Sequence, residues 1–215
     1  MAKKALLVQG GWEGHEPKEC AELWAKILTG EDFEVTVADS LDVLRDAAFM
    51  AELNVVTPIW TMGTIEADQF EGLQKAVASG VGLAGWHGGM ADAFREHLGY
   101  KFMVGGQFMD HPDGLKGYEV NILDTGDLIT AGIEDFSVHS EQYYMHTDPG
   151  NEVLATTTFT TKSKPWVHGT VMPVVWNRNW GAGRIFYSSL GHQVKEFDNV
   201  SLREIQLRGI QWAAQ

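Results

Sequence analysis

The chain has 215 residues, 44% of them hydrophobic and 21% charged, which suits one folded domain and excludes disordered, collagen-like and coiled-coil architectures. Its 29 acidic and 16 basic residues give a net charge of −13, a field that repels nucleic-acid phosphates and anionic lipid surfaces. We therefore expect no nucleic-acid and no membrane partner. No apolar run approaches the roughly 18 residues of a membrane helix, and no signal-peptide core is visible, so we expect a cytoplasmic protein.

In the first half of the chain, short apolar runs alternate with longer segments of helical periodicity, which is the pattern of an α/β fold. The predicted strands are residues 5–8, 34–37, 53–60 and 81–85. The predicted helices are residues 17–28, 41–50, 66–79 and 91–98, with Pro17 opening the first and Gly30 and Gly80 following the first and third. This order favours a doubly wound, mostly parallel sheet.

Beyond Tyr100 the helical periods give way to glycine, histidine, aspartate, proline and aromatic residues, so we expect a loop-rich C-terminal half. Strands are predicted at residues 118–123, 153–157, 172–176 and 184–188, the last two as a hairpin, and a helix at residues 200–214 closes the chain. Gly209 and Ile210 lie on the apolar face of that helix. No repeat or linker interrupts the pattern, so residues 1–215 are expected to form a single domain.

The loops after the first, third and fourth predicted strands carry aromatic and histidine residues. They contain Trp12 and His15, then Trp60 and Thr61, then Trp86 and His87. Ligands of parallel sheets bind beyond the carboxyl ends of the strands, so these residues are expected to line one cleft. Flat aromatic faces suit the C–H faces of a sugar, and there is no P-loop, no dinucleotide-binding glycine motif and no basic cluster for a phosphate. We therefore expect a small-molecule sugar as the ligand.

The segment Gly85-Trp86-His87-Gly88-Gly89, between a predicted strand and a helix, has the form of a nucleophile elbow with histidine at its apex. Such a turn strains the apical backbone and exposes the side chain to a ligand, although glycine-rich turns also occur for packing alone. A cysteine there would indicate a glutaminase and a serine a hydrolase. The one cysteine, Cys20, lies in the first predicted helix and is expected to be a small buried residue.

Several motifs in order along the chain resemble the ThuA-like (trehalose utilisation) family. They are the elbow segment, Asp110-His111-Pro112, Ser140-Glu141-Gln142-Tyr143, Pro173-Val174-Val175-Trp176, Gly183-Arg184-Ile185-Phe186-Tyr187 and Leu190-Gly191-His192. The resemblance runs nearly end to end. It implies a flavodoxin-like, class I glutamine amidotransferase-like three-layer sandwich, in which His87 replaces the glutaminase cysteine, and a context of sugar metabolism.

The resemblance also implies a set of site residues. His192 falls where glutaminase relatives keep their catalytic histidine, but the glutamate expected two residues later is Val194, and Glu196 is the nearest acid. Glu141 is the carboxylate that could reach in from another loop. We expect His87, His192 and Glu141 to be catalytic. The expected substrate-binding residues are Trp12, His15, Trp60, Asp110, His111 and His146, for each of which a packing or solvated role stays open.

We expect a sugar-metabolism enzyme that acts on a keto-sugar or keto-glycoside by acid–base chemistry, without glutaminase activity. A carbonyl acidifies the adjacent C–H, so isomerisation, epimerisation or elimination needs only a base, an acid and an oxyanion stabiliser. A non-catalytic carbohydrate-binding or regulatory domain and a metal-dependent hydrolase are the alternatives. No cofactor is established, but a divalent metal would take His15, His87, Glu141 and His192, although no local ligand motif is present. A homo-oligomer is left open.

Overall fold

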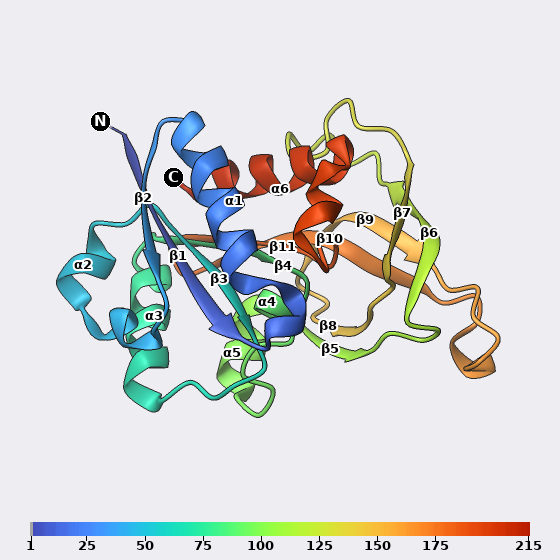
Figure 1. Cartoon of the computed structure of the whole chain (residues 1–215), viewed down its shortest axis with the longest axis horizontal. Coiled ribbons are helices and arrows are strands. Elements are labelled where there is room, and N and C mark those ends of the chain that lie inside the picture. The colour runs from blue at the N-terminus through green and yellow to red at the C-terminus, as the bar shows by residue number, and fades with distance from the viewer. Residues whose placement is uncertain (1) are drawn as a thin grey trace.

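The computed structural model describes residues 2–215, and its main feature is a nine-stranded sheet in the order β2-β1-β3-β4-β11-β10-β9-β6-β7 (Figure 1). The parallel strands are β1 (Lys3–Gly11), β2 (Phe33–Ala38), β3 (Val55–Thr61), β4 (Gly82–Trp86) and β11 (Gly183–Ser188). The antiparallel continuation is β10 (Val171–Trp180), β9 (Glu152–Thr158), β6 (Leu115–Ile122) and β7 (Phe136–Glu141). Strands β5 (Gly106–Asp110) and β8 (Tyr144–Thr147) form a separate pair.

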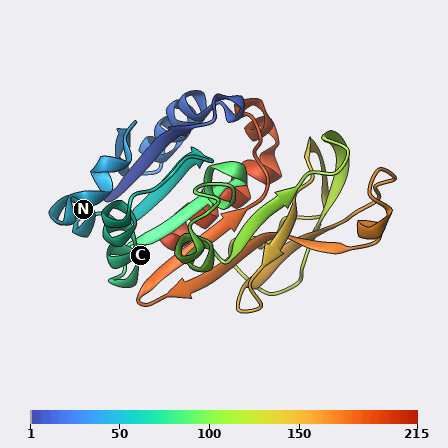
Figure 2. The same ribbon diagram turned by 90° about the horizontal axis from the view of Figure 1, so that it is seen from below.

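Helices cover both faces of the parallel strands, which confirms the predicted three-layer α/β, flavodoxin-like fold (Figures 1 and 2). Helices α1 (Pro17–Gly30) and α6 (Val200–Ala213) pack on one face. Helices α2 (Ala47–Ala51), α3 (Ala67–Ala78) and α5 (Leu98–Val104) lie on the other, and α4 (His87–Ala91) follows β4 directly. Short 3-10 helices occupy Glu13–His15, Leu41–Arg45, Pro165–Val167 and Val194–Asp198. None of the helices in residues 2–215 combines the length and apolar character needed to cross a bilayer.

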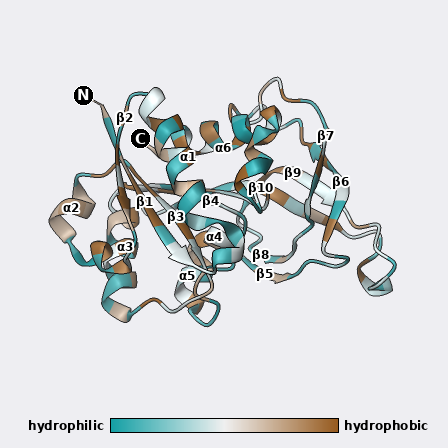
Figure 3. Cartoon of the chain, viewed as in Figure 1, coloured by the Kyte–Doolittle hydropathy of each residue, from teal (hydrophilic) through white to brown (hydrophobic). Residues whose placement is uncertain are grey.

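Successive residues of β1 are apolar because the strand is buried on both faces. Ala5 and Leu7 pack into the core beneath α1 and α6, whereas Leu6 and Val8 pack into the core beneath α2, α3 and α5. The helices themselves are amphipathic, and in Figure 3 they carry hydrophobic and hydrophilic residues side by side. The two cores hold the parallel strands rigidly, so that their carboxyl ends form a fixed edge.

Two predicted helices differ from the structure. The segment 41–50 is split into a 3-10 helix and α2, because Asp46 leaves the helical conformation and its side chain accepts a hydrogen bond from the Phe49 N–H, which starts a new helix. The predicted helix 91–98 is wrong: α4 already starts at His87 and ends at Ala91, and α5 begins at Leu98. Strands β5, β7 and β8 are not among the predicted strands. β5 and β8 mix polar and aromatic residues without clean alternation, and β7 alternates only over its first four residues.

Gly209 lets α6 approach β11 closely, as expected from its place on the apolar helix face. A Cβ atom at this position would lie 2.3 Å from Cε1 of Phe186, a ring that is fully buried. We expect Gly209→Ala to lower the free energy of unfolding by about 1–3 kcal/mol through overpacking, although alanine favours a helix. Gly30→Ala, where a Cβ would meet nothing within 4 Å, is the matched control and should be near neutral in urea unfolding. Equal effects of the two changes would contradict this account.

Candidate functional site

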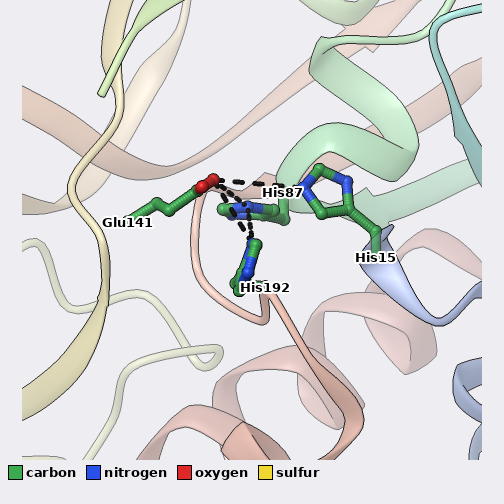
Figure 4. Close-up of side chains that lie close together, drawn as sticks. All are labelled: His15, His87, Glu141 and His192. Atoms are coloured by element: carbon green, nitrogen blue, oxygen red, sulfur yellow. Dashed lines mark hydrogen bonds and ion pairs between the residues drawn. The ribbon is translucent and has the colours of Figure 1, made fainter. Parts of the chain in front are cut away.

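Four side chains from distant parts of the chain converge at the carboxyl edge of the sheet (Figure 4). His15 comes from the turn after β1, His87 from the start of α4 after β4, and His192 from the loop after β11. Glu141 is the last residue of β7 and arrives from the antiparallel part of the sheet. The predicted convergence of His15 and His87 on one site is therefore found, and His192 and Glu141 join them.

The turn at His87 has the strained backbone of an elbow. His87 has φ of 46°, a left-handed conformation that costs energy in a residue with a Cβ. A Cβ on Gly88 would lie 2.4 Å from Cε1 of His15, so glycine at position 88 is what allows the two imidazoles to meet. The expectation that His87 is exposed is wrong: only 1% of it is accessible, because its ring stacks on Tyr143 at a centroid distance of 3.9 Å.

Three of the four converging atoms form a nearly equilateral triangle. Nε2 of His87 lies 3.2 Å from Oε2 of Glu141, Nδ1 of His192 lies 3.3 Å from the same oxygen, and the two nitrogens are 3.3 Å apart. Nε2 of His15 stands farther away, at 3.9 Å from Oε2 of Glu141. All four atoms lie within 4.8 Å of one another.

Hydrogen bonds outside the triangle fix which ring atoms face its centre. Nδ1 of His87 lies 2.8 Å from the carbonyl oxygen of Ser189, and since a carbonyl only accepts, this nitrogen carries the hydrogen. In the neutral ring, Nε2 then directs a lone pair toward the carboxylate of Glu141, which also offers only lone pairs. Nδ1 of His15 is held by Oγ1 of Thr61 at 2.8 Å. The centre of the cluster therefore needs a positive charge, from a proton or from a metal ion.

The pKa values of two members reflect this crowding. Burial, and after it the neighbouring His87 and His192, lower the pKa of His15 to about 2. Burial alone would raise the pKa of Glu141. Hydrogen bonds from His192 and His87, with the positive charge of these imidazoles when they are protonated, outweigh burial and hold the pKa well below its ordinary value. A neutral imidazole and an ionised carboxylate are the forms in which these side chains bind metals.

The geometry of the group fits a metal ion. In tetrahedral zinc sites, bonds of about 2.0–2.1 Å give ligand–ligand edges of about 3.3 Å. The edges between His87, Glu141 and His192 are 3.2 to 3.3 Å, while that from Glu141 to His15 is 3.9 Å. Imidazole nitrogens with one carboxylate oxygen are also a donor set that zinc and other first-row ions accept. The cluster could therefore hold a divalent metal ion.

Two predicted substrate-binding residues lie at the rim of the cluster. Trp12 is 46% exposed and meets the ring of His15 edge-on, with centroids 4.8 Å apart. The side chain of His111 is 42% exposed, and its Nε2 is 3.6 Å from Oε1 of Glu141, on the side away from the triangle. Asp110 pairs instead with Lys164, and its Oδ1 accepts a hydrogen bond from the backbone N–H of His111. Through this hydrogen bond, Asp110 positions the backbone of His111 at the rim.

Other expected site residues lie elsewhere. Trp60 packs against the core beneath α3, because its side chain points to the opposite face of β3 from that of Thr61. His146 is exposed on β8, and Trp86 is buried against Trp24, so neither belongs to the cluster. Cys20 is buried, as predicted.

Sequence analysis missed two residues that shape the site. The first is Tyr143, which stacks on His87. Tyr143 lies in the motif that carries Glu141, and this adjacency was the available signal. The second, Ser189, acts through its backbone carbonyl, so its residue type gave no signal. Thr61, which holds His15, lies in one of the loops expected to line the cleft.

The end of α4 is held by a buried lysine. Nζ of Lys101 donates to the carbonyl oxygens of Ala91 and Ala93, both at 2.7 Å. The bond to Ala91 satisfies a carbonyl at the end of the five-residue helix, and the bond to Ala93 fixes the segment that follows it. Burial lowers the pKa of Lys101 from its ordinary 10.5 to about 8.

This lowered pKa has a consequence for stability. Between pH 8 and pH 10.5 the unfolded chain keeps the Lys101 proton that the folded chain has lost, so rising pH favours the folded state across this window. In this pH window we expect the free energy of unfolding of the wild-type protein to increase with pH relative to that of Lys101→Met. The variant loses the two hydrogen bonds at every pH, but it has no titrating group at this position. Urea unfolding at several pH values measures the difference. Parallel pH profiles for the two proteins would contradict it.

The sequence matches the family described as ThuA, trehalose utilisation, over residues 4–213. None of the curated proteins matches this sequence. Among solved structures, a ThuA-like protein from Bacteroides uniformis ATCC 8492 superposes with a TM-score of 0.81 at 17% identity, covering 98% of this chain and 91% of that one. A ThuA-like protein from Parabacteroides merdae ATCC 43184 gives 0.79 at 16% identity, with 100% and 91% covered. At these identities the structural likeness establishes the fold alone.

Proposed function

The chain belongs to the ThuA, trehalose utilisation, family, and from this membership and the geometry of the site we propose that it is a carbohydrate-processing enzyme that acts on a sugar bearing a ring carbonyl. The observation that carries the proposal is the triangle of lone-pair atoms on His87, Glu141 and His192. It lies beneath a rim with an exposed tryptophan and a histidine, Trp12 and His111, that suit a sugar.

We propose that the cluster works with a divalent ion held by His87, Glu141 and His192. The fourth member, His15, lies farther out, with its Nε2 3.9 Å from Oε2 of Glu141. A substrate oxygen could therefore bind beside His15. When bound, such an ion acts as a Lewis acid on a carbonyl or hydroxyl oxygen. Four protein ligands would make a closed, structural site, whereas three leave a position for substrate. The longer distance of His15 therefore favours a catalytic site.

Proton transfer then falls to a residue outside the triangle. Nδ1 of His111 is buried without a hydrogen-bond partner among the described residues, and Nε2, the nitrogen that can take a proton, faces Oε1 of Glu141 at 3.6 Å. A substrate C–H beside the carbonyl gives its proton to His111. In an isomerisation the same proton goes to the former carbonyl carbon, while the hydroxyl proton on the neighbouring carbon moves to the former carbonyl oxygen. In an elimination the proton goes to the leaving oxygen. In a metal-free site, His87 and His192 would form the proton-transfer pair, with Glu141 sharing the proton.

The metal part of the proposal has a direct test. Chelator-treated protein is expected to take up one zinc or cobalt ion per chain, and an ion at about 100 times its Kd should raise the free energy of unfolding by about 2.7 kcal/mol. His87→Ala and His192→Ala should each weaken binding by more than the roughly 10- to 100-fold that losing an outer hydrogen-bond partner costs. His139→Ala, which removes an exposed histidine of β7, is the matched control. If the protein takes up no stoichiometric metal, the metal part of the proposal is wrong and the site works by acid–base chemistry without a metal.

The reaction can be followed by NMR in D2O. We expect oxidised trehalose that carries one ring carbonyl to exchange hydrogen for deuterium beside that carbonyl and to form product, while unoxidised trehalose stays unchanged. His87→Ala and His111→Ala should each lower the rate by about 100-fold or more, the usual contribution of a positioned acid or base, whereas His139→Ala should not.

Two outcomes would contradict this function. Line broadening of the sugar signals without product would identify a non-catalytic carbohydrate-binding domain. Hydrolysis without deuterium exchange, lost on chelation, would identify a metal-dependent hydrolase, in which a bound water attacks instead of a base removing a carbon-bound proton.

A further inference from the structure

The segment between Ser189 and Glu196, which follows β11, contacts every member of the cluster or its immediate neighbour. Its first residue accepts the hydrogen bond from His87, and it contains His192. The backbone N–H of Val194 donates to Oε2 of Glu16, the residue directly after His15, at 3.0 Å. The remaining link runs to the strand that carries Glu141.

That link is made by one oxygen of Glu196. Its Oε2 accepts the backbone N–H of His192 at 3.0 Å and the hydroxyl of Ser140 at 2.9 Å. Ser140 precedes Glu141 and is fully buried. In the sheet, β10, β9 and β6 lie between β11 and β7, so the two segments do not pair as strands. Hydrogen bonds to an ionised acceptor are about twice as strong as neutral ones, which makes this a firm clamp.

We propose that Glu196 is a positioning residue of the site, which acts through Ser140 and the backbone of His192 to set the distance between Oε2 of Glu141 and Nδ1 of His192. Without the carboxylate, a buried hydroxyl and a buried N–H lose their acceptor, and the loop and the strand are free to separate. The effect on turnover rests on the proposed function, whereas the effect on geometry does not.

The chain offers a matched control. Nδ2 of Asn199 donates to the carbonyl oxygen of Ser137 at 3.3 Å, and its Oδ1 caps α6 by accepting the Leu202 N–H. Asn199→Ala thus removes a second link between the same two regions and costs stability, but leaves Ser140 and His192 untouched. A residue that merely stabilises the fold would behave as Asn199 does.

The test compares Glu196→Ala, Glu196→Gln, Ser140→Ala and Asn199→Ala in the full chain. We expect Glu196→Ala to weaken zinc binding by about 10- to 100-fold and to lower kcat by a similar factor with KM nearly unchanged. Glu196→Gln should lose clearly less than Glu196→Ala, because one amide oxygen can accept both hydrogen bonds, although without the added strength of an ionised acceptor. Combining Glu196→Ala with Ser140→Ala should cost less than the sum of the two changes, since both break the same contact.

Crystal structures supply a readout that needs neither metal nor activity. The 3.3 Å separation between Glu141 and His192 should widen in Glu196→Ala and persist in Glu196→Gln. An unchanged separation in Glu196→Ala overturns the inference, as does the same loss of zinc binding in Asn199→Ala or in Glu196→Gln. If the wild-type protein neither binds zinc nor turns over sugar, the proposed function fails, and the crystal structures alone decide the role of Glu196.

Discussion

The site is organised by three polar atoms that meet with too few hydrogens to pair them all. His87 must keep its hydrogen on Nδ1 for the Ser189 carbonyl, so in the neutral ring its Nε2 faces the carboxylate of Glu141 with a lone pair. Nδ1 of His192 carries at most one hydrogen and has two neighbours at 3.3 Å. Buried lone pairs at such distances repel unless a cation lies among them. The surrounding structure has to hold the three atoms in place against this repulsion.

The two halves of the sheet share that task. The parallel strands bring His15, His87 and His192 to one edge, because they follow the carboxyl ends of β1, β4 and β11, which all run in the same direction. The antiparallel strands bring Glu141, the last residue of β7, to the same edge. The carboxylate is therefore supplied by a different part of the fold from the imidazoles, and contacts such as those of Glu196 and Tyr143 are needed to align it.

The sequence predicts the fold class and the place of the site, and the reasons are physical. Buried parallel strands are runs of apolar residues, and helices show apolar residues every three or four positions. The parallel half of the fold can therefore be predicted from the sequence. The course of the chain after His87 is not, because Gly88 and Gly89 suggest a turn and are in fact helical residues chosen for the close approach of His15 and β3. Trp60 and His146 could not be placed, because a shift of one residue along a strand reverses the face. Contacts through backbone atoms, as at Ser189, leave no trace in residue type.

A histidine at the apex of the elbow changes what this turn can do. A cysteine there attacks a substrate and needs an exposed sulfur, whereas His87 is covered by Tyr143 and has one nitrogen committed to the protein. Only Nε2 remains, and it points sideways into the cluster rather than outward to solvent. The apex therefore serves as a ligand or as part of a shared-proton group, and the outward-facing role passes to Oε1 of Glu141 and to His111. The strained φ at His87 is retained because it aims Nε2 at Glu141.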